Sequence, residues 1–186
     1  EGATDSVEEQ LWLRRRVADI ASTKLDQTAL AVEQQRAILD ARPGDAAAAE
    51  ALEAIHRANA QFKELQELLV HRHRHAANDE ERHRHLAELA RLEEEVLEDV
   101  DSAAGRYRQI LELVPADRHA LAALDRLAVA AGRWDEVASV IRRRLENAES
   151  DPERNDLTLR LGEVLATALG DHRGALDAFG RVVARK

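Results

Sequence analysis

The chain of 186 residues is acidic, with a formal net charge of −9, and it contains neither cysteine nor methionine. Because binding to a phosphate backbone needs a basic face, this charge argues against nucleic acid as a partner. The lack of cysteine excludes disulfides, thiolate metal sites and thiol catalysis, and a hydrophobic content of 45% with only 3% aromatic residues is typical of long helices rich in Ala and Leu.

The chain shows no targeting or membrane segment. No apolar run reaches the roughly 18–20 residues of a membrane span, and no signal-peptide core is visible. The chain begins with Glu1-Gly2-Ala3 and ends with Arg185-Lys186, so we expect a fragment of a longer protein or a processed one. The excess of Ala, and of Arg over Lys, indicates a GC-rich genome. The sequence does not fix localisation, although the cytoplasm is favoured.

A repeat of 72 residues runs through the sequence. Three stretches align without gaps at this spacing, and they begin at Leu25, Leu97 and Leu169. The alignment divides the chain into about two and a half copies of one unit, at residues 8–80, 80–152 and 152–186. Self-similarity at a fixed period is the signature of repeat architectures, so we expect a single repeat array over residues 1–186.

Each copy of the unit is predicted to form two helical hairpins. Asp and Ser recur where helices are expected to begin, because their side chains accept hydrogen bonds from free N–H groups, and Gly and Pro recur where helices end. In chain order, the predicted helices span residues 6–24, 27–41, 46–59, 61–74, 79–97, 100–113, 117–131, 133–147, 153–169 and 171–185. The fold is therefore predicted to be all-α, and its frequent turns argue against the sustained heptads of a coiled coil.

The segment LAALDRLAVAAGRWDEVASVIRRRL, residues 121–145, resembles one tetratricopeptide repeat (TPR), a helix hairpin of about 34 residues. The residues at the positions that define the pattern are Leu124, Gly132, Trp134, Val137 and Ile141. The resemblance, to degenerate TPR-like repeats of the bacterial type, extends over nearly the whole chain. It implies a right-handed α-solenoid of about five stacked hairpins, because no single hairpin can bury its apolar stripe alone.

The same resemblance implies a non-catalytic protein–protein interaction scaffold. In this family, a peptide or a partner helix binds in the concave groove lined by the first helix of each hairpin. The resemblance nominates Arg57 and Arg126, which are expected to match by register, with Ala54, Ala122 and Val129 beside them.

No enzymatic motif stands against this interpretation. There is no Gly-x-Ser-x-Gly setting and no Gly-rich phosphate loop, so neither a catalytic residue nor a cofactor is predicted. The acidic run Glu93-Glu94-Glu95 is interpreted as a solvated helix face. The chain can still be the regulatory arm of an enzyme that lies outside this fragment.

The stretch HRHRHAANDEERHRH, residues 71–85, carries five of the eight histidines. His71 and His75 are four residues apart on one helix, a spacing that can chelate a divalent ion. A metal- or pH-responsive binding module is therefore the alternative function. The repeat favours a packing role for three of these histidines, because His73, His83 and His85 stand where other copies carry leucine.

The two ends of the array are predicted to expose apolar surface. Trp12 matches polar residues in the other copies, so it either covers the open first layer or contacts a partner. The last helix is expected to expose Ala178, Val182 and Val183. Solenoid ends need covers for solubility, so self-association through these ends is predicted beside a protein or peptide partner.

Overall fold

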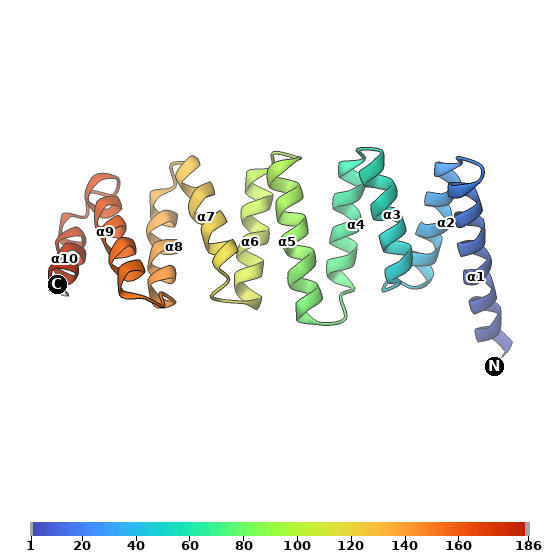
Figure 1. The fold of residues 1–186 in the computed structure, drawn as a ribbon, viewed down its shortest axis with the longest axis horizontal. Helices are drawn as coiled ribbons and strands as arrows, with labels where there is room; N and C mark the ends of the chain where they lie inside the picture. The colour runs from blue at the N-terminus through green and yellow to red at the C-terminus, as the bar shows by residue number, and fades with distance from the viewer. Residues whose placement is uncertain (1, 185–186) are drawn as a thin grey trace. The chain divides into compact units, whose positions relative to one another are not determined.

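The computed structural model describes residues 2–184, which form ten α-helices and no strand (Figure 1). The helices are α1 (Gly2–Thr23), α2 (Thr28–Ala41), α3 (Ala46–Ala58), α4 (Phe62–Arg74), α5 (Asp79–Glu95), α6 (Val100–Leu113), α7 (Arg118–Ala130), α8 (Trp134–Glu146), α9 (Asp151–Thr167) and α10 (His172–Val183). The predicted all-α class and the ten predicted helices are confirmed.

The largest difference from the predicted bounds lies at the start of α1, and a second informative one lies at the start of α9. Helix α1 begins at Gly2, four residues before the predicted start. Helix α9 begins at Asp151, so Pro152 falls inside its first turn. Proline is tolerated there because its missing N–H would have no partner within the helix, and the Ser150 side chain caps the helix by accepting from the N–H of Glu153.

Helix starts repeat with the sequence period. Asp45 caps α3 and Asp117 caps α7, each accepting a hydrogen bond from the N–H three residues further along. Asn78 and Ser150, also 72 residues apart, cap α5 and α9 in the same way. An N-cap stabilises a helix by about 1 kcal/mol, so these residues fix where each helix of the repeat begins.

The backbone conformation at the ends of helices also repeats with the sequence period. Asp26, Glu98 and Gly170 are spaced by 72 residues and have φ angles of 52°, 54° and 65°. Ala60 and Gly132, at a second equivalent turn, have φ angles of 54° and 66°. Glycine adopts this left-handed region without steric cost, yet only two of these five turns use it, which explains why glycine spacing alone does not reveal the repeat.

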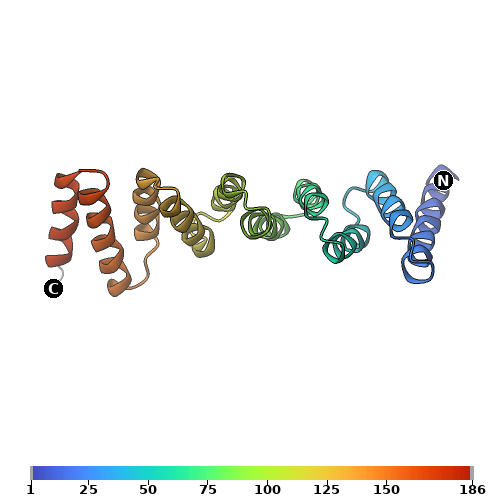
Figure 2. The ribbon, with the colours of Figure 1, turned by 90° about the horizontal axis from the view of Figure 1, so that it is seen from above.

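The chain divides into two compact units, and the boundary in the sequence falls between Glu98 and Asp99. Within each unit, and among the described residues, helices pack against their neighbours in the chain, as α1 does against α2 and α9 against α10 (Figures 1 and 2). That one array continues through both units remains a prediction.

Each unit has its own aliphatic core. In the first unit, α1 to α4 contribute to one cluster, which comprises Leu11, Ile38, Leu39, Ala48, Ala49, Leu52 and Leu68. A second cluster joins α4 to α5 through Leu65, Leu69, Leu89 and Leu92. In the second unit, α8 and α9 form the centre of the core, with Val137, Ile141, Leu157, Leu161, Val164 and Leu165. These clusters bury apolar side chains of neighbouring helices against one another, as a stack of hairpins requires.

The interpretation of the Glu93 run as solvated is wrong for Glu93 itself. Its side chain is fully buried, and its Oε1 accepts a hydrogen bond of 2.8 Å from Nε2 of Gln66 on α4. The equivalent positions in the other copies are the buried residues Ala21 and Leu165. Glu93 therefore occupies a core position of α5, and the amide of Gln66 offsets part of the cost of burying the carboxyl group.

Candidate functional site

A buried acidic residue lies on the first helix of an equivalent hairpin in each unit. Glu53 on α3 and Asp125 on α7 are 72 residues apart, and both side chains are buried. Burying an ionised carboxylate is costly unless it is paired. Arginine side chains from the neighbouring helices supply that pairing in both units.

In the first unit, two arginines share the carboxylate of Glu53. Oε1 forms an ion pair with Arg57, one turn further along α3, at 2.5 Å, and Oε2 accepts a hydrogen bond from Arg72 on α4. These three side chains line a surface cavity of about 420 Å³ together with Glu50, Ala54 and Arg84. Arg84 has no ion-pair partner within the part of the chain that the structure describes, so the cavity carries an excess of positive charge.

In the second unit, Asp125 is held in a related way. Its carboxylate accepts from Arg144 on α8 at 3.4 Å and from both terminal nitrogens of Arg160 on α9, one of them at 2.8 Å. Arg144 is the repeat equivalent of Arg72, so the acid and one arginine are kept in both units. The second arginine differs, because it comes from the same helix in one unit and from the next helix in the other.

The predicted groove residues lie on α3 and α7, the helices that carry these buried acids. Arg57 and Ala54 line the cavity of the first unit, while Ala122, Arg126 and Val129 are exposed on α7. The arginines occupy different turns of equivalent helices, because Arg57 corresponds to Val129 and Ala54 corresponds to Arg126. Their role in binding remains a prediction.

The sequence analysis missed the buried acids and their arginines. A signal was present, because Glu53 and Asp125 each follow an aligned leucine, Leu52 and Leu124. An acid at the same position of two repeats, beside a core residue, indicates a buried ion pair. The arginines that satisfy it come from neighbouring helices, and sequence spacing alone does not identify them.

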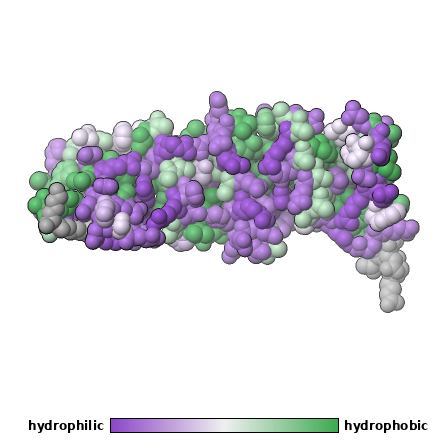
Figure 3. Space-filling model, in the orientation of Figure 1, coloured by the Kyte–Doolittle hydropathy of each residue, from purple (hydrophilic) through white to green (hydrophobic). Residues whose placement is uncertain are grey.

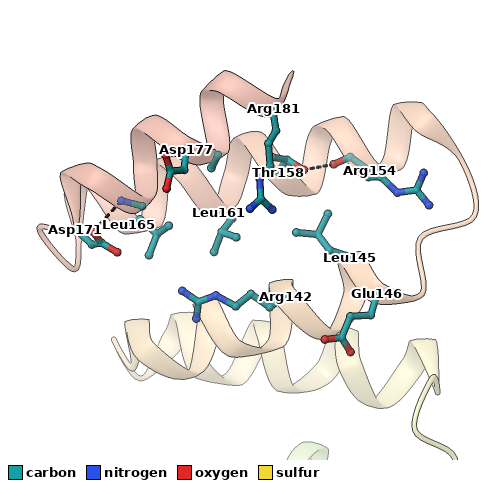
Figure 4. A pocket seen from close by; sticks show the side chains of 12 residues that line it. Arg142, Leu145, Glu146, Arg154, Thr158, Leu161, Leu165, Asp171, Asp177 and Arg181 are labelled. Carbon is teal, nitrogen blue, oxygen red and sulfur yellow. Dashed lines mark hydrogen bonds between the residues drawn. The ribbon is translucent and has the colours of Figure 1, made fainter. Parts of the chain in front are cut away.

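A second cavity, of about 540 Å³, lies in the second unit between α8, α9 and α10 (Figure 4). Leu145 of α8 and Leu161 and Leu165 of α9 contribute its large apolar side chains, and charged side chains surround them. The charged residues are Arg142, Glu146, Arg154, Asp171, Asp177 and Arg181. Equal numbers of basic and acidic groups make this cavity electrostatically balanced, unlike the cavity beside Arg57.

His71 has a structural contact that its repeat equivalent shares. Its Nε2 lies 2.9 Å from the carbonyl oxygen of Pro43, just beyond the end of α2. Arg143, 72 residues later, donates from Nε to the carbonyl oxygen of Pro115 at 3.1 Å. Both side chains therefore satisfy a carbonyl group that the end of a helix leaves without a partner.

The His71–His75 pair does not form part of a larger ligand set. The two rings are tilted, with centroids 4.5 Å apart. Among the described residues, no group of three or more His, Asp or Glu side chains is placed to hold a metal ion. The specific contact of His71 is the one to Pro43.

The remaining histidines of the cluster follow the leucine positions of the repeat. His85 is buried, and His73 and His83 are half-buried. Burial lowers the pKa of His85 below its ordinary value of 6.5, and the charges of Arg72 and Arg84 lower it further. Glu81 and Glu53 oppose this effect more weakly, so the pKa of His85 stays depressed.

Trp12 lies on the surface of α1, with 59% of the residue exposed. The prediction for the other end of the chain needs correction. On α10, Ala178 and Val182 are buried and only Val183 of the three predicted residues is exposed, together with Leu176. Helix α10 packs against α9, with its Phe179 against the core cluster of the second unit, and it exposes Leu176 and Val183 instead of the predicted face.

Comparisons with known proteins identify the fold. No family model and no curated relative matches the chain. Among solved structures, MamA AMB-1 in its P212121 crystal form gives a TM-score of 0.50 at 19% identity, covering 95% of this chain and 91% of that one. Another MamA crystal structure gives 0.49 at 14% identity, covering 95% and 92%. YrrB, described as a TPR protein with an unusual peptide-binding site, gives 0.49 at 18% identity, covering 99% and 92%.

The fold is that of TPR-like α-solenoids, as the residue pattern predicted. At these identities the similarity concerns the fold alone. Within the described residues, no helix combines the length and the apolar character that crossing a membrane requires.

Proposed function

We propose that this chain is a non-catalytic scaffold that binds an acidic peptide or partner helix on the faces of α3 and α7. The observation that supports this proposal most directly is the cationic cavity around Arg57. There a buried carboxylate orients two arginines, and Arg84 stands beside them with no ion-pair partner among the described residues. Arginine suits this role because its planar fork binds carboxylates bidentately.

The ion pairs of Glu53 with Arg57 and Arg72 make the cavity suitable for binding an acidic ligand. A side chain already held by an ion pair loses less rotamer freedom when a partner binds. Arg57 keeps about half of its side chain exposed while it is paired, so part of its guanidinium group remains accessible to a ligand. In the second unit, Arg126 on α7 would provide a basic contact, with Ala122 and Val129 as apolar contacts beside it, and in the first unit Trp12 would provide an apolar contact.

The experiment uses a displayed library of acidic peptides, with affinity measured for the selected sequences at two salt concentrations. We expect the double variant Arg57→Glu/Arg126→Glu to bind at least tenfold more weakly, because each charge reversal replaces attraction by repulsion. The affinity of the unaltered chain should also fall with salt, since exposed charges are screened.

Arg108→Glu is the matched control. Arg108 is similarly exposed but lies on α6, the second helix of its hairpin, where it pairs with Glu136 on α8. This variant should keep its affinity. If the double variant retains the same peptides with the same affinity, the assignment of the binding surface to α3 and α7 is wrong.

A further inference from the structure

Three arginines from three consecutive helices line the cavity of about 420 Å³ in the first unit. Arg57 lies on α3, Arg72 on α4 and Arg84 on α5. Hydrophilic side chains cover much of the face shown in Figure 3, so polar surface alone does not mark a site. This cavity is distinctive because its charges do not balance. The acids that line it beside the three arginines are Glu50 and Glu53.

The repeat shows that the fold does not need all three arginines. In the second unit, the equivalents of Arg57 and Arg84 are Val129 and Asp156. An equivalent hairpin therefore forms with an apolar side chain at the first position, and the helix that follows it forms with an acid at the second. Of the three arginines, only Arg72 on α4 has an arginine as its equivalent.

Arg84 is also surplus to the pairing of the buried acid. The carboxylate of Glu53 is already shared by Arg57 and Arg72, while Arg84 has no ion-pair partner within residues 2–184. The three side chains differ in exposure, because 15% of Arg72 and 52% of Arg57 is exposed, and Arg84 is exposed as well. An anion that enters the cavity therefore meets one mostly buried arginine and two accessible ones.

We propose that the acidic residue bound in this cavity is a phosphorylated serine or threonine of a partner peptide. This inference rests on the proposed function and names its ligand. A carboxylate presents two oxygens in one plane, which a single guanidinium fork satisfies. A phosphoryl group presents three terminal oxygens in different directions and carries about two negative charges at pH 7, which suits three arginines that come from three helices.

The peptide chain has a path away from the phosphoryl group. A second cavity, of about 220 Å³, shares Glu50, Arg72 and Arg84 with the first, so the two cavities adjoin. Small residues at the start of α3, among them Ala46 and Ala49, contribute to its lining and leave room for main chain. Three acids and two arginines line this second cavity, so the phosphoryl group belongs in the first.

The test compares three peptide pools that are identical except for a central serine, glutamate or phosphoserine. Fluorescence anisotropy at low salt measures their binding to the whole chain. We expect the phosphoserine pool to bind about tenfold more tightly than the glutamate pool, because the third arginine gains an oxygen to pair with. Inorganic phosphate should displace the phosphopeptides only in large excess, since it makes no contact in the second cavity.

Arg84→Ala measures the contribution of the third arginine. This variant should lose the preference for phosphoserine over glutamate, because the two remaining arginines are those that a carboxylate also uses. Arg91→Ala is the matched control, since Arg91 is exposed on the same helix, two turns further along and outside both cavities, and it should keep the preference. Glu50→Gln should act in the opposite direction and tighten phosphopeptide binding about threefold, because it removes a repelling charge from the lining.

The outcomes separate this inference from the proposed function. Equal affinity for the phosphoserine and glutamate pools would overturn the inference and leave the binding of acidic peptides standing. A preference for phosphoserine that survives Arg84→Ala would also overturn it. Displacement by equimolar inorganic phosphate would indicate a site for the free anion instead of a peptide. If no pool binds, the proposed function fails and this inference fails with it.

Discussion

At the scale of single residues, the polar side chains in the interior determine how this chain responds to its conditions. His85 takes the place of a leucine in the core between α4 and α5, and its buried Nδ1 has no hydrogen-bond partner among the described residues. The nearest carboxylate oxygen, Oε2 of Glu88, lies 4.0 Å away. Burial therefore lowers the pKa of His85, and the charges of Arg72 and Arg84 lower it further.

This arrangement predicts a loss of stability in mild acid. The pKa of His85 is lower in the folded chain than its ordinary value of 6.5, so below that pH the unfolded state binds more protons than the folded state. The free energy of unfolding then decreases as the pH falls from 6.5 towards the folded pKa. We expect His85→Leu to flatten this part of the pH profile and to stabilise the fold at pH 7 by about 1 kcal/mol, because a buried polar atom without a partner is removed.

Urea unfolding between pH 5 and pH 8 measures both effects. His75→Leu is the control, because His75 is exposed at the end of α4 and its loss should leave the pH profile as steep as before. If the free energy of unfolding of His85→Leu fell as steeply with decreasing pH as that of the unaltered chain, other groups would cause the loss of stability.

At the scale of helices, a single glycine determines how closely α9 approaches α10. A Cβ added at Gly162 would lie 2.5 Å from Cε1 of Phe179, which is closer than carbon atoms can pack. The equivalent residues on α1 and α5 are Ala18 and Ala90. Phe179 also takes the position that Gln35 holds on α2, so a small residue on α9 accompanies a large one on α10.

We therefore expect opposite results from the same substitution at two glycines. Gly162→Ala should lower the free energy of unfolding by about 1–3 kcal/mol, because the core must shift to admit a methyl group. Gly105→Ala on α6 should raise it by about 0.5–1 kcal/mol, since no heavy atom lies within 4 Å of the new Cβ and alanine is the better helix former. Denaturant unfolding of the two variants measures the difference, and a gain at Gly162 would refute the close approach of α9 and Phe179.

At the scale of the whole molecule, the repeat is what made the structure predictable from sequence. Aligning the copies placed the turn residues at equal intervals, and most of the ten helices then begin and end within two residues of their predicted bounds. The same alignment matched His85 to Leu13 and Leu157, which indicated partial packing against apolar groups, and the structure buries His85. Local signals of capping and apolar spacing are enough to predict the helix bounds where each helix packs only against its neighbours in the chain.

The candidate site was less predictable, because it depends on contacts between helices. Spacing along α3 identified Arg57 as an exposed cation, but it did not show that Glu53 would be buried beneath it or that Arg72 would reach it from α4. The misreading of Glu93 has the same origin, since a run of three acids looks solvated until Gln66 is placed beside it. Side-chain partners from a neighbouring helix leave little trace in a single sequence.

Packing between chain neighbours also determines how far a local defect spreads. In repeat proteins stability is approximately a sum of the stability of each repeat and of its interfaces with its neighbours. Ile141 on α8 and Ile38 on α2 are both fully buried, one in the core of each unit. Replacing either by alanine should cost about 2–5 kcal/mol, because it opens a cavity in a close-packed core.

Amide hydrogen exchange shows which helices lose stability in each variant. We expect Ile141→Ala to accelerate exchange in α7 to α10 and to leave α1 to α3 protected, while Ile38→Ala should give the reverse pattern, because each substitution weakens the interfaces of its own unit first. The two variants serve as controls for each other, since they remove the same atoms from equally buried sites. If either variant accelerated exchange equally from α1 to α10, the two units would have to unfold as one cooperative structure, and the division between Glu98 and Asp99 would carry no energetic meaning.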